Sequence, residues 1–148
     1  MLAYDHDRIH QVSRFEDLAG QPTGAEQGSA GANALLSGAQ GALRDKVKIY
    51  AEADAALLAL FSGEIAAVMV TRSQYESALK TQGKSAARFL VTELESPVLP
   101  PRGWAIGMAV KEDQRALAQA LESALQALRE SGELQRIFAR YGVSIVAP

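Results

Sequence analysis

A short polar run, Glu26-Gln27-Gly28-Ser29-Ala30-Gly31, has the residue types of a turn that opens a helix and can hold an anion. The first amides of a helix lack an acceptor inside the helix and carry the positive end of its dipole, so a carboxylate or phosphate can bind there. Gly28 allows the backbone to approach a ligand closely, and the Ser29 hydroxyl either caps the helix or donates to the anion. Both roles, capping and anion binding, are open for this run.

The segments around this run alternate between short apolar stretches and helical patterns, which favours an α/β fold with a mostly parallel sheet flanked by helices. Pro22 and Gly24 favour an edge position or a distorted start for the strand that precedes the run. Thr71, like Ser29, follows a strand, so we expect both residues at the carboxyl edge of the sheet, where ligands bind. The expected strands are residues 2–4, 23–26, 47–50, 65–70 and 88–91, with helices at 29–37, from a cap at Asp54 to Ser62, and at 72–80.

The residue composition of the sequence changes after Glu95. Residues 96–103 are rich in proline and glycine and predict a connector, and residues 104–110 alternate like a further strand. A long helix capped by Asp113 is expected next, with an apolar stripe that continues after Gly132 and ends at Gly142. The stripe comprises Leu117, Leu121, Ala124 and Leu128, then Leu134, Ile137, Phe138 and Tyr141.

Composition excludes several classes of function. The 148 residues are 48% hydrophobic and 22% charged, which is typical of a globular domain with a core. A formal net charge of −2 and only 6% aromatic residues argue against nucleic acid as a partner. No apolar run approaches the ~20 residues that span a bilayer, and the first residues lack the pattern of a signal peptide. Cysteine is absent, so disulfides and thiolate chemistry are excluded.

Two further groups of residues have types that could do chemistry. His6 and His10 have a spacing that binds metal on a helix, and Glu93 and Glu95 form a carboxylate pair at a strand end. The histidine segment has a loop pattern without further metal-ligating motifs, and no nucleophile or histidine lies near the glutamates in sequence. We therefore expect no metal site, no cofactor and no catalytic residues.

Several blocks of the sequence resemble, in order and spacing, the bacterial extracellular solute-binding proteins of family 3. The blocks are Asp17 to Gly20, Gln27 to Ser29, Leu60 to Val68, Gly103 to Gly107 and Leu128 to Gly142. The resemblance implies the type II periplasmic-binding-protein fold, in which two three-layer lobes close on a polar amino acid or similar solute. Such proteins deliver the solute to the membrane subunits of an ABC importer or to a sensor, and the resemblance implies a periplasmic location.

Against this family the chain corresponds to the second lobe and the C-terminal segment. Residues 1–99 match the second-lobe α/β domain, and residues 100–148 match the return strand and the C-terminal helices that normally pack on the first lobe. Most of the first lobe, with the family's arginine that clamps a ligand carboxylate, has no counterpart here. The resemblance thus implies a truncated half-site.

The ligand-binding residues implied by the resemblance are few. Gln27, Gly28, Ser29 and the Ala30 amide match the family's anion-holding turn, and Thr71 occupies the position where amino-acid binders usually have an aspartate for the ammonium group. This replacement weakens an amino-acid interpretation, since a charge-assisted hydrogen bond is worth about 1.5–3 kcal/mol. Arg72 is either a solvated surface residue or a contact to a second anionic group, in which case the ligand is acidic.

Three functional hypotheses remain from the sequence. The first is a solute-binding half-site for a small anionic or zwitterionic ligand such as an amino acid. The second is an enzyme related to dehydratases of this fold, against which the missing aspartate at Thr71 argues. The third is a self-associating structural protein, which is compatible with the first. Because exposed leucine stripes are unfavourable in water, we expect a homodimer in which residues from about Trp104 onward pack against a second copy. Exchange of the return strand and helices around Pro100-Pro101 is one form that this dimer can take.

Overall fold

The computed structural model describes residues 1–99 and 106–145. The chain divides into two compact units, Met1–Gly103 and Trp104–Pro148, and each is described here by itself. No helix in the described ranges combines the length and apolar character needed to cross a membrane. The assignment of the two parts to a second lobe and to lobe-packing helices stays a prediction.

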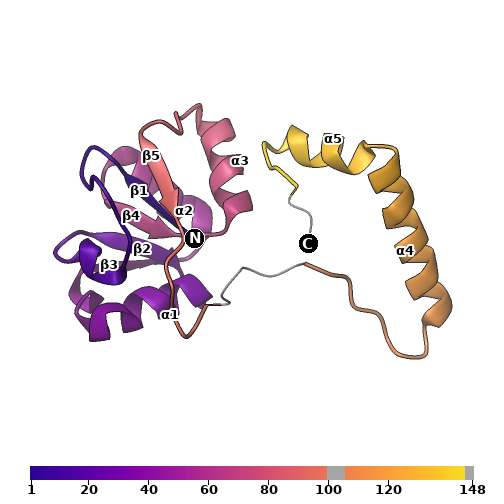
Figure 1. Ribbon diagram of the computed structural model, residues 1–148, viewed down its shortest axis with the longest axis horizontal. Helices are drawn as coiled ribbons and strands as arrows, with labels where there is room; N and C mark the ends of the chain where they lie inside the picture. Colours follow the sequence, from indigo (N-terminus) through magenta and orange to yellow (C-terminus); the bar gives the residue numbers. More distant parts are fainter. Residues whose placement is uncertain (100–105, 146–148) are drawn as a thin grey trace. The chain divides into compact units, whose positions relative to one another are not determined.

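The first unit alternates strands and helices along the chain (Figure 1). The strands are β1 (Leu2–Asp5), β2 (Thr23–Glu26), β3 (Val47–Tyr50), β4 (Ala67–Met69) and β5 (Phe89–Thr92). The α-helices are α1 (Ala30–Ser37), α2 (Ala53–Ser62) and α3 (Arg72–Gln82). Three short 3-10 helices lie at Phe15–Leu18, Gly38–Gly41 and Arg44–Lys46.

These strands form a single mixed sheet in the order β3-β2-β4-β1-β5. Strand β2 is parallel to β3 and to β4, whereas β1 is antiparallel to both β4 and β5. Four strands therefore share one direction and β1 opposes them, which confirms the expected mostly parallel sheet. Of the two alternatives for residues 23–26, the edge position is wrong, because β2 lies between β3 and β4. Its Gly24 leaves room for packing instead, since a Cβ there would lie 2.7 Å from Ile65 Cδ1.

Helices cover both faces of the sheet, giving the three-layer arrangement implied by the resemblance (Figure 1). On one face, Ala25 and Met69 of the sheet pack with Leu35 of α1 in one buried cluster. On the other face, Val68 packs with Leu57 of α2 and Tyr75 of α3. Burial of these side chains is the main favourable contribution to folding, about 1.5–3 kcal/mol for each large apolar residue.

The ends of α2 show how local sequence sets its limits. The helix ends before Gly63, whose φ of +82° is the left-handed conformation that glycine adopts most easily. At the other end the cap position is Glu52, so the expectation of a cap at Asp54 is wrong. Asp54 lies in the first turn, where a carboxylate is favourable through the helix dipole without capping.

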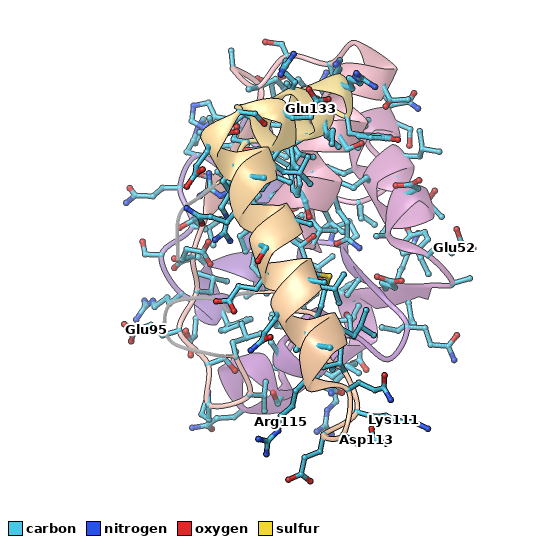
Figure 2. The ribbon with its side chains drawn as sticks, turned by 90° about the vertical axis from the view of Figure 1, so that its right-hand side faces the viewer. Glu52, Glu95, Lys111, Asp113, Arg115 and Glu133 are labelled. Carbon is cyan, nitrogen blue, oxygen red and sulfur yellow. The ribbon has the colours of Figure 1, made fainter. Side chains whose placement is uncertain are left out.

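The second unit contains α4 (Arg115–Glu130) and α5 (Glu133–Arg140), separated by a turn at Gly132. Lys111, Asp113 and Arg115 lie around the start of α4, and Glu133 begins α5 (Figure 2). The cap of α4 is Gln114, so the prediction of Asp113 as the cap is wrong by one residue. No residue among 106–145 is buried, although both helices are strongly amphipathic.

The strand expected at residues 104–110 is not formed in the part that can be described. Residues 106–110 have no strand assignment, while residues 100–105, including Trp104 and Pro100-Pro101, lie outside the described residues. A strand requires a neighbour for its backbone hydrogen bonds. None of the described ladders includes residues 106–110, so their alternating pattern alone does not produce a strand.

Candidate functional site

The register of two neighbouring parallel strands brings the candidate site residues to one edge of the sheet. Ala25 of β2 is paired with Met69 of β4, and both strands run in the same direction. Gln27 and Thr71 each lie two residues beyond this pair. The turn before α1 and the turn before α3 therefore share the carboxyl edge of the sheet, as expected for a ligand site in an α/β fold.

The turn before α1 has the geometry of a capped helix start. Gly28 has a φ of +72°, and Ser29 is the cap residue, with its Oγ accepting a hydrogen bond of 3.0 Å from the Ala32 amide. The Gln27 amide donates to the Tyr50 carbonyl of β3 at 2.8 Å, which anchors the turn to the sheet. The capping role proposed for Ser29 is thus present, and its hydroxyl hydrogen is left to donate to a ligand.

Gly31 fixes how closely α1 approaches the sheet. A Cβ at this position would lie 2.7 Å from the Cβ of Met69, the last residue of β4. Only glycine allows the first turn of α1 to pack directly on this strand end. The unpaired amides of that turn, from Ala30 and Gly31, consequently lie next to the end of β4.

The turn before α3 is organised by Thr71 and Gln74. Thr71 is the cap residue, with Oγ1 accepting from the Gln74 amide at 3.3 Å. Gln74 Oε1 accepts from the Thr71 amide and from the Thr71 hydroxyl, each at 2.9 Å. This reciprocal arrangement is a capping box, and it holds the Gln74 side chain in one orientation.

Glu26 links the two turns through Gln74. The sequence alone did not indicate this role for either residue. The Gln74 Nε2 donates to Glu26 Oε2 at 3.3 Å, across 48 residues of sequence. The Thr-x-x-Gln spacing at residues 71–74 is the signal that would have indicated the capping box. The contact to Glu26 had no such signal, because it depends on the neighbouring positions of β2 and β4.

Arg72 is placed differently from the other predicted site residues. Its side chain is 56% exposed, and Nη1 lies 3.9 Å from Glu76 Oε1, one turn further along α3. An exposed pair of this kind contributes little to stability. The structure therefore brings together Gln27, Gly28, Ser29, Ala30 and Thr71, whereas Arg72 is engaged along its own helix.

Lys48 and Tyr50 of β3 form hydrogen bonds with Glu64, which lies between α2 and β4, before β4 begins and therefore toward the edge of the sheet opposite the candidate site. Tyr50 Oη donates to Glu64 Oε1 at 3.0 Å, and Lys48 Nζ donates to the same oxygen at 3.2 Å. Burial, together with the neighbouring carboxylate, raises the pKa of Tyr50 to about 12. Tyr50 is thus a neutral phenol at physiological pH, and it acts as a structural donor.

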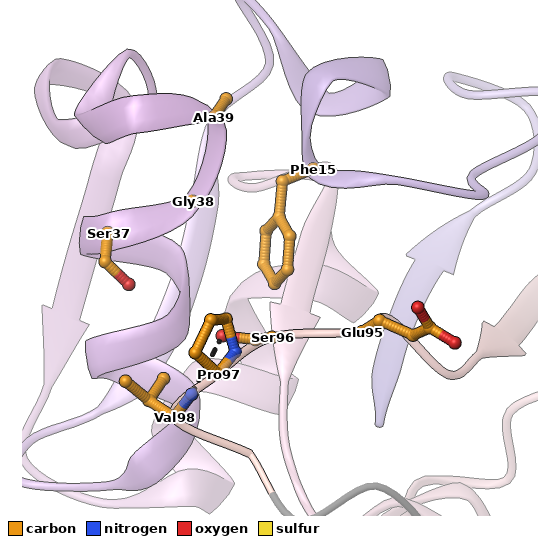
Figure 3. A pocket seen from close by; sticks show the side chains of 8 residues that line it. All are labelled: Phe15, Ser37, Gly38, Ala39, Glu95, Ser96, Pro97 and Val98. Carbon is orange, nitrogen blue, oxygen red and sulfur yellow. Dashed lines mark hydrogen bonds between the residues drawn. The ribbon is translucent and has the colours of Figure 1, made fainter.

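A cavity of the first unit lies away from these two turns. It measures about 400 Å³, and its lining contains none of the predicted site residues. Its walls come from the end of α1, from Phe15 and from the segment after β5, with Ser96 and Val98 joined by a hydrogen bond of 3.4 Å (Figure 3). Glu95 lines this cavity, whereas Glu93 lies 3.8 Å from the Met1 nitrogen, so the two glutamates do not form one site.

Comparison with solved structures identifies the fold. The chain matches the amino acid ABC transporter substrate-binding protein AbpA from Streptococcus pneumoniae, bound to L-arginine, with a TM-score of 0.65 and 19% identity. It matches the GlnP substrate binding domain 2 from Lactococcus lactis, in an open conformation, with a TM-score of 0.61 and 26% identity. No protein-family model matches the sequence, and no curated protein matches it.

These matches extend over most of this chain but over only part of the other proteins. The matches cover 95% and 98% of this chain, but only 55% and 58% of AbpA and of the GlnP domain. The match to domain 2 from TmArgBP, by contrast, covers 97% of that domain and 64% of this chain. Its TM-score is 0.51, with 18% identity. The chain thus has the α/β fold of amino acid substrate-binding proteins of ABC transporters, over about half their length.

Proposed function

We propose that this chain provides one half of a binding site for a small polar solute, an amino acid or a related zwitterion or anion. The observation that carries this proposal is the meeting of two helix starts at the ends of β2 and β4, on a fold shared with amino acid substrate-binding proteins. The Ala30 and Gly31 amides and the Ser29 hydroxyl would bind a carboxylate. Thr71 would contact the other end of the solute.

The proposed role is binding and delivery rather than catalysis. The solved neighbours are substrate-binding proteins, and two of them hold L-arginine or glutamine. By analogy, the solute would be passed to the membrane subunits of an ABC importer or to a sensor. Such a role requires a periplasmic or extracellular location, which cell fractionation with an antibody against the chain would test.

A thermal-shift screen of the full chain tests solute binding. A ligand that binds only the native state raises the melting temperature in proportion to the logarithm of its concentration. We expect at least one of L-arginine, L-glutamine, L-glutamate and succinate to raise it at millimolar concentration by about 2–4 °C. Glycerol at equal concentration is the control for non-specific effects. The proposal fails if none of these solutes shifts the melting temperature more than glycerol does.

A second proposal concerns association with a second copy of the chain. Leu117, Phe138 and Tyr141 of the second unit are 48%, 39% and 66% exposed, and they belong to the amphipathic helices α4 and α5. An apolar stripe of this kind is covered in most proteins, since each buried leucine contributes about 1.5–3 kcal/mol. We therefore propose a homodimer formed through residues of this unit, including exchange of the unit between copies. Sedimentation equilibrium at micromolar concentration measures the mass, and a monomer would contradict this proposal.

A further inference from the structure

The carboxylate of Glu26 lies inside the candidate site, at the end of β2. Glu26 is half-buried and immediately precedes the turn before α1. Its Oε2 is 3.3 Å from the Gln74 Nε2 in the turn before α3. The Glu26 carboxylate is thus at the junction of the two turns that the proposed function uses.

The orientation of Gln74 follows from the chemistry of its partners. The Thr71 amide can only donate, so Gln74 must present its carbonyl oxygen to that amide, at 2.9 Å. The amide nitrogen of Gln74 then faces Glu26. Thr71 and Gln74 therefore form a neutral pair that holds the carboxylate of Glu26 in place.

No positive charge compensates Glu26 within residues 1–99 and 106–145. Its contact to Gln74 is a hydrogen bond with a neutral amide, and no described lysine, arginine or histidine lies within ion-pair distance of it. Arg72, the cation next to Thr71, is paired with Glu76 instead. A partly buried carboxylate without a cation attracts a positively charged ligand group, because that group replaces lost hydration.

We propose that Glu26 binds the positively charged nitrogen of the solute, with Thr71 and Gln74 as positioning residues. Thr71 itself offers no charge, so Glu26 supplies the anion that the turn before α3 lacks. The solute class is then an amine that also has a carboxylate, such as a zwitterionic or cationic amino acid. The inference rests on the proposed function, and it selects amino acids over dicarboxylates.

Glu26→Gln in the full chain is the variant that tests this assignment. The glutamine keeps the size of the side chain and an oxygen that accepts from Gln74, so only the charge is removed. Glu16→Gln, at an exposed position of the first 3-10 helix, is the matched control for the change in net charge. A 1H–15N correlation spectrum of each variant verifies the fold.

The probes are L-arginine, L-glutamine and succinate, titrated at millimolar concentration with amide shifts as the readout. We expect Glu26→Gln to lower the affinity for L-arginine and L-glutamine by about tenfold or more and to leave the affinity for succinate undiminished. Glu16→Gln should bind all probes like the wild type.

Two results overturn the assignment while the proposed function stands. One is equal affinity of wild type and Glu26→Gln for L-glutamine and L-arginine, and the other is a wild type that binds succinate but neither amino acid. Absence of binding of every probe to the wild type contradicts the proposed function itself, and the assignment of Glu26 with it.

Discussion

Asp5 is a fully buried carboxylate at the end of β1, and it is paired with a single arginine. Arg88 Nε and Nη2 lie 3.1 Å from Oδ1 and 2.7 Å from Oδ2 of Asp5, which is a bidentate contact. The Arg88 guanidinium also lies 5.2 Å from the centre of the Phe89 ring. The hydrogen bonds from Arg88 hold the pKa of Asp5 below its ordinary value of 3.8, although burial opposes this shift.

We predict that Asp5→Asn lowers the free energy of unfolding by about 1.5–3 kcal/mol at neutral pH, because a charge-assisted hydrogen-bond pair is lost. A lowered folded-state pKa means that the contribution of Asp5 is present above the unfolded pKa and is lost as pH falls through the folded pKa. The difference between wild type and variant should therefore shrink in acid. Urea unfolding followed by circular dichroism over a range of pH measures it.

Asp7→Asn is the matched control for this prediction. Asp7 Oδ2 lies 3.3 Å from Arg88 Nε, but the Asp7 side chain is 70% exposed, so its loss should change stability little. A difference for Asp5→Asn that stays constant into strongly acidic solution would contradict the assigned role of the ion pair.

Ser29 has two roles that a single substitution can separate. Glycine is nearly as good as serine at a helix cap, so Ser29→Gly should cost only a few tenths of a kcal/mol in stability. Loss of the hydroxyl donor should lower the affinity of the site for a carboxylate about two- to tenfold. Calorimetric titration with the best solute of the screen measures the affinity, and Ser37→Ala, at the other end of α1, is the control. Unchanged affinity would remove Ser29 from the site.

The residue contacts divide into those with a local pattern and those without one. The cap at Ser29 and the left-handed Gly63 could be predicted, because both depend on neighbouring residues in sequence. The link from Glu26 to Gln74 and the pair of Asp5 with Arg88 could not, since they join residues 48 and 83 positions apart. Such contacts exist only after the strand order has been set.

At the scale of elements, the order of strands and helices in residues 1–99 could be predicted from apolar periodicity, but details of the boundaries could not. The caps of α2 and α4 are Glu52 and Gln114, each displaced from the expected aspartate. Aspartate is favourable at several positions of a first turn, so its presence does not fix the first helical residue. Residues 106–110 show the complementary error, in which an alternating pattern has no neighbouring strand among the described ladders.

The contact between α1 and β4 gives a prediction at this scale. Alanine is intrinsically better than glycine in a helix, yet Gly31→Ala would place a Cβ 2.7 Å from that of Met69. We expect the clash to dominate and the variant to lose about 1–3 kcal/mol of stability. Asn33→Ala, at an exposed position of α1, should be neutral or slightly stabilising. Thermal unfolding measures the stability of both variants relative to the wild type. A stabilised Gly31→Ala would contradict the close approach of α1 to β4.

At the scale of the whole molecule, residues 1–99 contain a core on both faces of the sheet, whereas residues 106–145 contain no buried residue. The stripe on α4 and α5 could be predicted from its periodicity, but what covers it could not, because the covering surface is not encoded in the pattern itself. Association with a second copy is our proposal for that cover.

We predict that Leu117→Glu combined with Leu128→Glu converts a dimer of the full chain into a monomer, because the charges would have to be buried at the contact. Gln119→Glu combined with Ser123→Glu adds the same charge on the opposite side of α4 and should leave the dimer intact. Sedimentation equilibrium compares the masses. Equal masses for the two double variants would contradict an interface through the leucine stripe.

Mapping of a bound solute onto the amide spectrum of the full chain tests the central claim most directly. That claim is that the ends of β2 and β4 form a half-site for a small polar solute. We predict that the best solute of the screen shifts the amides of residues 27–31 and 71–74 and leaves those around the cavity at Phe15 and Val98 unchanged. Shifts confined to that cavity, or spread over residues 106–145, would contradict the claim.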